Sequence, residues 1–524
     1  MIKCHKRVIF LILTIILTFL VLACVATRLL AVGIWLYNPL HSFNRWWMPF
    51  LVLLYCFIVV VIGFYAIEME KEKMLRLISI FLVLGQFFLS LAITFLSPLT
   101  YMLLPWLVIN PASNSYFSTA VETKNLLKLL QHFEKKMPNH IQDAFGREWQ
   151  PRSPKANEPP LISHAATQAP GLIVFCGITR QIVMKLPFLI WFAEQILLLS
   201  PGVTTEEIAK AMQRWHNVSV TPEDVAAALW CAVVYIIIGC GAIFFIIHIG
   251  KLIKNLKVGW GSAALFAIIP AFHIFTPSVD QMYPTVTAMI TFLVIFALHC
   301  IVTNISKSFF AFIVAGFVLG FSIFINLGFI VLLLFCIFLI CINACQMPKH
   351  FRGHFLGIIS FIAAFLITLF ALCLLTGCNI WAVFRKSDML RMQLYSIHTP
   401  RPYLPWVWGN LVDFFVFTGI PLTIGFMYQV TREMKAAVKE HSLSSFSPML
   451  WAFILTFFLL LFSGKVRGEA ARMWLFLTPM VVVPASIALD ELGIWEQKEW
   501  AIAILTLQSL NALVLQEFLR VWGV

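Results

Sequence analysis

Residues 225–250 read VAAALWCAVVYIIIGCGAIFFIIHIG and contain no Asp, Glu, Lys or Arg. A helix needs about 20 mostly apolar residues to cross the hydrocarbon core of a bilayer, so this run predicts a transmembrane helix. The whole chain has the same character, since 61% of its 524 residues are apolar and only 12% are charged. Soluble domains are about half apolar and about a quarter charged. The composition therefore excludes a soluble enzyme and a disordered chain, and it predicts an integral membrane protein.

Apolar runs of similar length on either side of 225–250 predict an all-α, polytopic membrane protein with about 12–13 transmembrane helices. The expected spans lie near residues 8–32, 48–67, 77–106, 225–250, 259–275, 282–303, 308–325, 327–345, 354–376, 404–430, 447–463, 473–489 and 500–519. The stretch 171–199 differs, because charged residues and a proline divide it into two runs that are each too short to cross. We expect such runs to lie in the membrane interface or to re-enter.

Lys and Arg in short loops predict the orientation of the chain, because these residues are enriched on the cytoplasmic side. A cytoplasmic N-terminus also places the cations of loops 67–76, 251–258 and 431–442 inside. The long segment 107–224 then forms an outer-face insertion of loops and interfacial helices within one membrane domain, 1–524. The same topology leaves cations in short outer loops, which we take as candidates for a function: Arg28, Arg45, Arg385, Lys386, Arg391, Arg401, Lys465, Arg467 and Arg472.

The N-terminal apolar run passes through Val21-Leu22-Ala23-Cys24, which is similar to a lipoprotein cleavage box. Because the run continues beyond Cys24, an uncleaved first span is the preferred prediction, and lipidation of Cys24 is the alternative. The 12 cysteines contain no C-x-x-C pair and lie mostly in apolar runs. Neither a disulfide framework nor a zinc site is indicated.

The net charge narrows the class of binding partner. There are 37 Lys and Arg against 24 Asp and Glu, a formal charge of +13. No basic cluster interleaved with aromatic residues lies in a polar module, so nucleic acid is not expected as a partner. Membrane lipids with anionic headgroups, or a phosphorylated substrate, fit the excess of cations better.

Polar residues that could take part in catalysis or binding gather in segments that the predicted topology places on the outer face. These segments are 113–117 (SNSYF), Ser163-His164 with Pro170-Gly171, 275–284 (FTPSVDQMYP), 401–414 (RPYLPWVWGNLVDF) and 464–479 (GKVRGEAARMWLFLTP). They lie far apart in the sequence but on one predicted side of the membrane. A site assembled from several loops needs that arrangement, whereas a purely structural protein does not.

In their order and spacing these segments resemble bacterial multi-spanning proteins related to the GT-C glycosyltransferase superfamily. The resemblance covers the chain from about Asn114 to Pro479. It implies a GT-C-like polytopic fold in the bacterial inner membrane and transfer of a sugar from a polyprenyl-phosphate donor on the non-cytoplasmic face. The chain departs from the pattern in two places: residues 27–49 contain no Asp or Glu, and Gln168-Ala169-Pro170-Gly171 replaces a His-Pro-Pro-Gly motif.

Three residues are candidates for acid–base catalysis. Asp280 precedes a span as a general base or metal ligand, or alternatively caps the helix that follows. Glu469 stands among cations at a membrane boundary, and His164 is the imidazole nearest the altered motif. Asp413 lies inside a predicted span, where an acid suggests a function unless Arg401 or an indole satisfies it. Whether a divalent metal takes part is left open.

The cations and polar residues around these acids are candidates for binding the donor phosphate. Arg side chains form planar forks that suit a phosphate, and Trp474 marks headgroup depth. The alternative is an interfacial anchor with a Glu469–Arg472 pair inside one helix. The predicted binding residues are Lys465, Arg467, Arg472, Arg401, Tyr403, Asn114 and Tyr116.

Three function classes remain open at this stage. The first is a membrane glycosyltransferase, which the crowding of charges at the outer ends of spans favours over ion-coupled transport. The second is a lipid transporter or flippase. The third is a non-catalytic membrane subunit that scaffolds a complex with other membrane proteins. The absence of Asp and Glu from residues 27–49 supports this alternative.

Overall fold

The computed structural model describes residues 2–26, 36–37, 48–69, 72–95, 102–111, 113, 115–145, 161, 163–200, 203–216, 218–398, 400–440 and 446–520. Within these ranges all regular secondary structure is helical apart from one antiparallel pairing of two-residue strands, β1 (Leu36–Tyr37) with β2 (Leu519–Arg520). The prediction of an all-α protein is confirmed. The likeness to GT-C folds stays a prediction.

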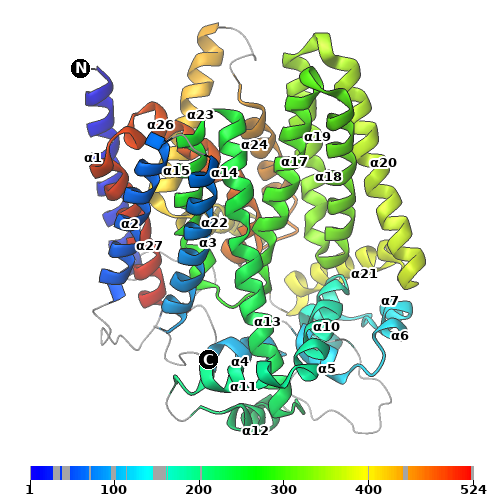
Figure 1. Ribbon diagram of the computed structural model, residues 1–524. Coiled ribbons are helices and arrows are strands. Elements are labelled where there is room, and N and C mark those ends of the chain that lie inside the picture. The colour runs from blue at the N-terminus through cyan, green and yellow to red at the C-terminus, as the bar shows by residue number, and fades with distance from the viewer. Residues whose placement is uncertain are drawn as a thin grey trace.

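The long helices form a bundle (Figure 1). They are α1 (Ile2–Ala26), α2 (Met48–Met69), α3 (Glu72–Phe95), α13 (Pro222–Cys240), α14 (Ala242–Ile253), α15 (Leu256–Ala267), α16 (Pro270–Ile274), α17 (Tyr283–Thr303), α18 (Ile305–Ile325), α19 (Ile330–Gln346), α20 (Phe351–Thr376), α22 (Tyr403–Thr418), α23 (Ile420–Glu440), α24 (Pro448–Phe462), α26 (Thr478–Glu491) and α27 (Lys498–Phe518). The shorter helices are α4 (Leu103–Ile109), α5 (Tyr116–Glu122), α6 (Leu126–Gln131), α7 (Phe133–Lys136), α8 (Ile141–Phe145), α9 (Ser163–Thr167), α10 (Gly171–Lys185), α11 (Pro187–Leu197), α12 (Thr205–His216), α21 (Ile380–Gln393) and α25 (Ala470–Met473).

Eight helical segments of the described chain are long and apolar enough to cross a membrane, or up to ten when each of two bent helix pairs counts as one span. A multi-pass membrane protein is therefore the class that the fold defines. The neighbouring spans predicted at 308–325 and 327–345 are separate helices, α18 and α19, as expected. The helix predicted at 77–106 ends earlier, at Phe95, and α4 follows as a separate helix.

The helix predicted at 404–430 is broken. Helices α22 and α23 meet at Gly419 with a bend of 112°. Gly419 has φ +106°, which a right-handed helix cannot continue, and a Cβ there would lie 2.1 Å from the Gln508 amide nitrogen. Gln508 in turn donates to the Thr418 carbonyl oxygen at 2.7 Å. The prediction of one continuous span is therefore wrong because a side chain from α27 occupies the bend.

The segment predicted to lie along the membrane surface consists of α10 and α11, which meet at 100°. At 1.5 Å per residue, 15 and 11 residues are shorter than a bilayer core of about 30 Å. Arg180 on α10 pairs with Asp224 of α13 at 2.5 Å, and Trp230 of α13 donates to the Leu189 carbonyl oxygen of α11 at 2.9 Å. These contacts hold α10 and α11 against α13.

The two ends of the bundle differ. In Figure 1 helices α4 to α7 and α10 to α12 gather at the lower end, and α21 lies beside them. The N-terminus, the connection between α19 and α20 and the last turns of α23 lie at the upper end. This separation is the one that the loop cations predict for 107–224 and 431–442. Which end faces the cytoplasm stays a prediction.

Candidate functional site

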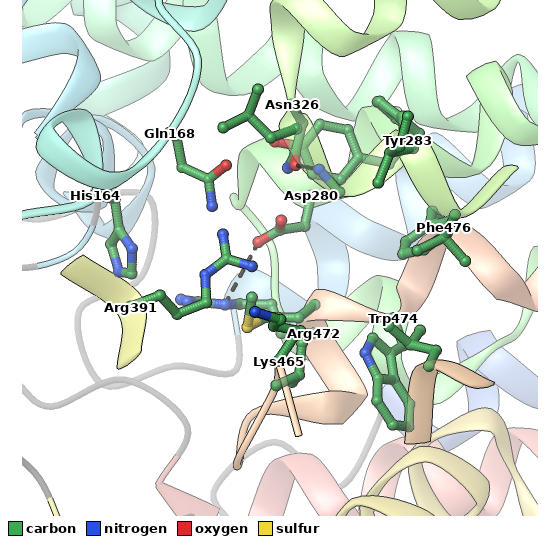
Figure 2. Close-up of a pocket in the computed structure, with 18 of the residues that line it drawn as sticks. His164, Gln168, Asp280, Tyr283, Asn326, Arg391, Lys465, Arg472, Trp474 and Phe476 are labelled. Carbon is green, nitrogen blue, oxygen red and sulfur yellow. Dashed lines mark hydrogen bonds and ion pairs between the residues drawn. The ribbon is translucent and has the colours of Figure 1, made fainter. Parts of the chain in front are cut away.

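A cavity of about 300 Å³ lies where helices α5, α9 and α21 meet the bundle (Figure 2). Its polar wall includes residues of α5, α9, α17, α21 and the loop between α24 and α25. Its apolar wall includes Val331 and Leu334 of α19 and Leu459 and Leu460 of α24. The charged and imidazole side chains that line it are His164, Asp280, Asp388, Arg391, Lys465 and Arg472.

Asp280 enters the cavity from the turn before α17. Ser278 caps this turn, because its hydroxyl accepts a hydrogen bond from the Asp280 backbone nitrogen at 3.2 Å. The same hydroxyl donates to Asp280 Oδ2 at 2.7 Å. The cap is therefore Ser278, and the helix-cap alternative for Asp280 is wrong. Asp280 instead projects into the cavity from the first turn, with 15% of its side chain exposed.

Arg472 joins two acids that lie far apart in the sequence. Its Nε is 3.4 Å from Asp280 Oδ2, and its Nη2 is 2.6 Å from Glu469 Oε2. Burial alone raises the pKa of Glu469, but Arg472, His164 and Arg401 outweigh burial, so the pKa lies below its usual value. The carboxylates raise the pKa of Arg472 against its own burial. Glu469 does not line the cavity itself, and it acts on the site through Arg472.

The loop that carries Arg472 is held by side chains from α22. Asn410 donates to the Val466 carbonyl oxygen at 2.7 Å and accepts from the Gly468 nitrogen at 2.9 Å. Gly464 and Gly468 have φ of +64° and +94°, values that favour glycine. Such a loop keeps its shape because two buried amide contacts and two left-handed glycines define it.

Arg401, Arg467 and Tyr403 do not line the cavity. Arg401 donates to the Arg467 carbonyl oxygen, and Arg467 donates back to the Arg401 carbonyl oxygen at 3.0 Å. Arg401 also stacks over Tyr395 and Trp406, and Arg467 over Tyr395 and Tyr403, at 5.5 to 5.7 Å from the ring centres. These contacts favour the interfacial-anchor alternative for the two arginines.

His164 of α9 and Tyr116 of α5 line the cavity. Burial lowers the pKa of His164 to about 4, with Arg472 and Arg391 adding to the effect, so the imidazole is neutral at pH 7. Burial raises the pKa of Tyr116 far above its usual value. Helix α9 is fixed beside α5 by a hydrogen bond from the Ala165 nitrogen to Ser115 Oγ at 3.2 Å. Asn114 lies outside the described residues.

Helix α21 supplies four cavity residues, of which only Arg391 is among the cations that the sequence marks as candidates for a function. Phe384, Ser387, Asp388 and Arg391 all line the cavity, and their spacing of three to four residues places them on one helical face. That spacing is a signal present in the sequence. Ser387 attaches α21 to α9, because its hydroxyl donates a hydrogen bond to the Thr167 carbonyl oxygen. Gln168, Tyr283 and Asn326 also line the cavity and are not among the predicted site residues.

The described part of the chain holds no group of three or more His, Cys, Asp or Glu residues that could bind a metal. Asp280 and Asp388, the two cavity acids, are paired with Arg472 and Lys465 instead. The donor set therefore does not fit a divalent metal, and no step below uses one. No known protein family matches the sequence, and no curated protein matches it either.

Proposed function

We propose that the protein is a membrane glycosyltransferase that moves a sugar from a polyprenyl-phosphate donor to an acceptor hydroxyl on the non-cytoplasmic face of the bacterial inner membrane. The observation that carries the proposal is a cavity in which a carboxylate, cations and an apolar wall from the bundle meet. A lipid-linked sugar phosphate has the matching parts: a hydroxyl-rich head, a phosphate and a long hydrocarbon chain.

The apolar wall supports a lipid substrate. Leu334 and Leu459 line the cavity and are also 41% and 51% exposed on the surface of the bundle. Their helices α19 and α24 are apolar segments of the bundle. Because α19 and α24 pack against each other, a hydrocarbon chain that lies along their shared outer surface stays in contact with lipid while its head occupies the cavity.

Asp280 is the base in this proposal. The hydrogen bond from Ser278 and the ion pair with Arg472 are both made by Oδ2, so Oδ1 is the oxygen we assign to the acceptor. Oδ1 takes the proton of the acceptor hydroxyl as the acceptor oxygen bonds to the anomeric carbon. The bond from that carbon to the phosphate oxygen breaks, and the phosphate leaves with the electron pair on the lipid. A base must lie within hydrogen-bond reach of the proton it removes.

Arg472 opposes the effect of burial on Asp280 and orients its carboxylate. A buried carboxylate without a cation tends to become protonated, and then it cannot act as a base. Glu469 fixes Arg472 on the side away from Asp280, and Arg401 in turn lies 3.7 Å from Glu469. We therefore propose a positioning role for Glu469, which does not line the cavity, in place of the catalytic role predicted from the sequence.

The test uses the full-length protein in lipid nanodiscs with a panel of synthetic undecaprenyl-phosphate hexoses and pentoses, and with membrane extract as the source of acceptors. Release of undecaprenyl phosphate is measured by mass spectrometry. We expect release from at least one donor, and its loss in Asp280→Asn. Asp490→Asn is the control, because Asp490 pairs with Lys254 at 3.0 Å in another ion-pair cluster. No release from any donor, or equal release by Asp280→Asn, would overturn the proposal.

A further inference from the structure

Ion pairs account for all but one of the charged side chains in the cavity. Asp280 and Glu469 share Arg472, and Arg401 lies beside Glu469. Asp388 holds Lys465 at 2.6 and 2.8 Å. His164 is neutral at pH 7. Arg391 is left over, because no hydrogen bond or ion pair reaches its side chain from any residue that the structure describes.

An unpaired guanidinium in a protein cavity costs free energy, because it gives up part of its hydration without gaining a partner. Arg keeps its charge at every physiological pH, so Arg391 cannot lower this cost by losing a proton. Arg391 is half-buried and lines the cavity on the face of α21 that also bears Asp388. Figure 2 shows Arg391, Gln168 and Asp280 pointing into the same space. The cavity therefore has one cation in excess, and it faces the space where a ligand binds.

A second observation points to the same kind of ligand. The indole nitrogen of Trp474 is buried without a hydrogen-bond partner among the described residues, and only 1% of Trp474 is exposed. Trp474 lines the cavity opposite Arg391 (Figure 2). An indole N–H only donates, so its partner is an acceptor. An unpaired cation and an unpaired donor in one cavity both call for an anion rich in acceptor oxygens.

We propose that Arg391 is the anion anchor of the cavity and binds the phosphate group of a lipid phosphate, with the Trp474 indole N–H as a second donor. The proposal rests on the proposed function for the identity of the lipid. It places the phosphate at a residue of α21, whereas the cations predicted from the sequence are Lys465, Arg467, Arg472 and Arg401. Lys465 and Arg472 are paired with acids, and Arg467 and Arg401 are occupied by each other and by aromatic rings. One free positive charge matches the single negative charge of a phosphodiester.

The apolar wall selects the lipid over a free phosphate as the source of this group. A phosphate held at Arg391 has Phe384 of the same helical face beside it, and Leu334 and Leu459 continue the wall to the lipid-facing surface. An inorganic phosphate leaves that wall uncovered. A lipid phosphate covers it with its first isoprene units and gains the hydrophobic contribution as well.

The experiment measures binding without any transfer. The full-length protein in nanodiscs is titrated with radiolabelled undecaprenyl phosphate, and undecaprenol serves as the uncharged probe. We expect undecaprenyl phosphate to bind at least about 10-fold more tightly than undecaprenol. In Arg391→Gln that preference falls about 10-fold or more, and in Trp474→Phe it falls about 2- to 10-fold, since a neutral hydrogen bond contributes less than a charged one.

Arg385→Gln is the matched control, because Arg385 lies on the same helix, is exposed and does not line the cavity. It should bind like the unmodified protein. Arg391→Lys keeps the charge without the fork and should give an intermediate affinity. Since Arg391 has no partner to lose, Arg391→Gln should unfold at the same temperature as the unmodified protein or higher, which separates lost binding from lost folding.

Two outcomes would overturn the proposal: equal affinity of Arg391→Gln and the unmodified protein for undecaprenyl phosphate, or displacement of the lipid by inorganic phosphate at a similar concentration. The second outcome would assign the anchor to a free phosphate. The proposed function fails separately, if Arg391-dependent binding is observed but no donor is consumed.

Discussion

Asp413 Oδ2 accepts a hydrogen bond from the backbone nitrogen of Ala471 at 2.8 Å. Asp413 is fully buried in α22, and Ala471 precedes the arginine that joins the two acids of the site. An acid inside a predicted span is a candidate for catalysis or ion transport by default. Here it fixes the loop that carries Arg472, so its role is to position the site.

The first prediction follows from this contact. Asp413→Ala leaves the Ala471 N–H without its acceptor, and a charged hydrogen bond of this kind contributes about 1.5–3 kcal/mol. Asp413→Asn keeps an acceptor oxygen and should lose less. Thermal unfolding in detergent measures both variants. An unchanged melting temperature for Asp413→Ala would show that the contact does not stabilise the loop.

The second prediction concerns the shared cation. Arg472→Gln removes the cation that Asp280 and Glu469 share, which leaves Asp280 with the Ser278 hydroxyl and Glu469 with the more distant Arg401. Removal of one member of a buried pair costs about 3–5 kcal/mol. The double variant Arg472→Gln, Glu469→Gln should recover part of that loss, because one of the two carboxylate charges is gone. The free energy of unfolding in detergent tests both. Equal values for the single and double variants would contradict the shared pairing.

The third prediction uses the left-handed glycine of the loop. Gly468→Ala places a Cβ at φ +94°, 2.8 Å from an Arg401 guanidinium nitrogen and 3.1 Å from the Trp406 ring. We expect a loss of about 1–3 kcal/mol. Gly425→Ala is the control, because its Cβ meets nothing closer than 3.4 Å. The control should be neutral or stabilising, and equal effects at both sites would argue against strain.

The fourth prediction is a pH dependence. His164 has its pKa lowered to about 4 in the folded protein, below the ordinary value of 6.5. Between these values the unfolded chain binds more protons than the folded one, so stability rises with pH from about 4 to 6.5 and is fully present above 6.5. His164→Gln should flatten this part of the profile. A profile that keeps its slope in the variant would assign the dependence to another group.

The fifth prediction is the topology. Lys128 is exposed on α6, and Lys439 is exposed at the end of α23. In cells with a permeabilised outer membrane, a membrane-impermeant maleimide should label Lys128→Cys and leave Lys439→Cys unlabelled until the inner membrane is opened. The unmodified protein provides the background from native cysteines. The reverse pattern would place the cavity on the cytoplasmic side.

The bundle could be predicted because hydropathy is a local property. A run such as 308–325 needs no knowledge of its neighbours to be recognised as a helix of the right length. The break at Gly419 could not be predicted in the same way, because it depends on Gln508, which is distant in the sequence and occupies the inside of the bend.

The site could be predicted in part. Asp280, Arg472 and Lys465 were selected because charges at membrane boundaries are costly and therefore informative, and the structure places all three in the cavity. Sequence alone does not show on which side of a loop a guanidinium lies, so Arg467 could not be separated from Arg472. Arg391 was noted only as an outer cation, because its unpaired state depends on which acids the fold assigns to other cations.

The double role of Leu334 and Leu459, as cavity wall and as outer surface, has a practical consequence for handling the protein. We expect an amphiphile with an anionic head and an alkyl tail to enter the cavity laterally from the bilayer or the detergent micelle, without passing through water. From the proposed lipid-phosphate site we expect detergents with sulfate or phosphate heads to compete with the substrate during purification, whereas uncharged maltosides should leave the anion-binding end of the cavity empty. An inactive preparation is therefore informative only after the amphiphile has been exchanged.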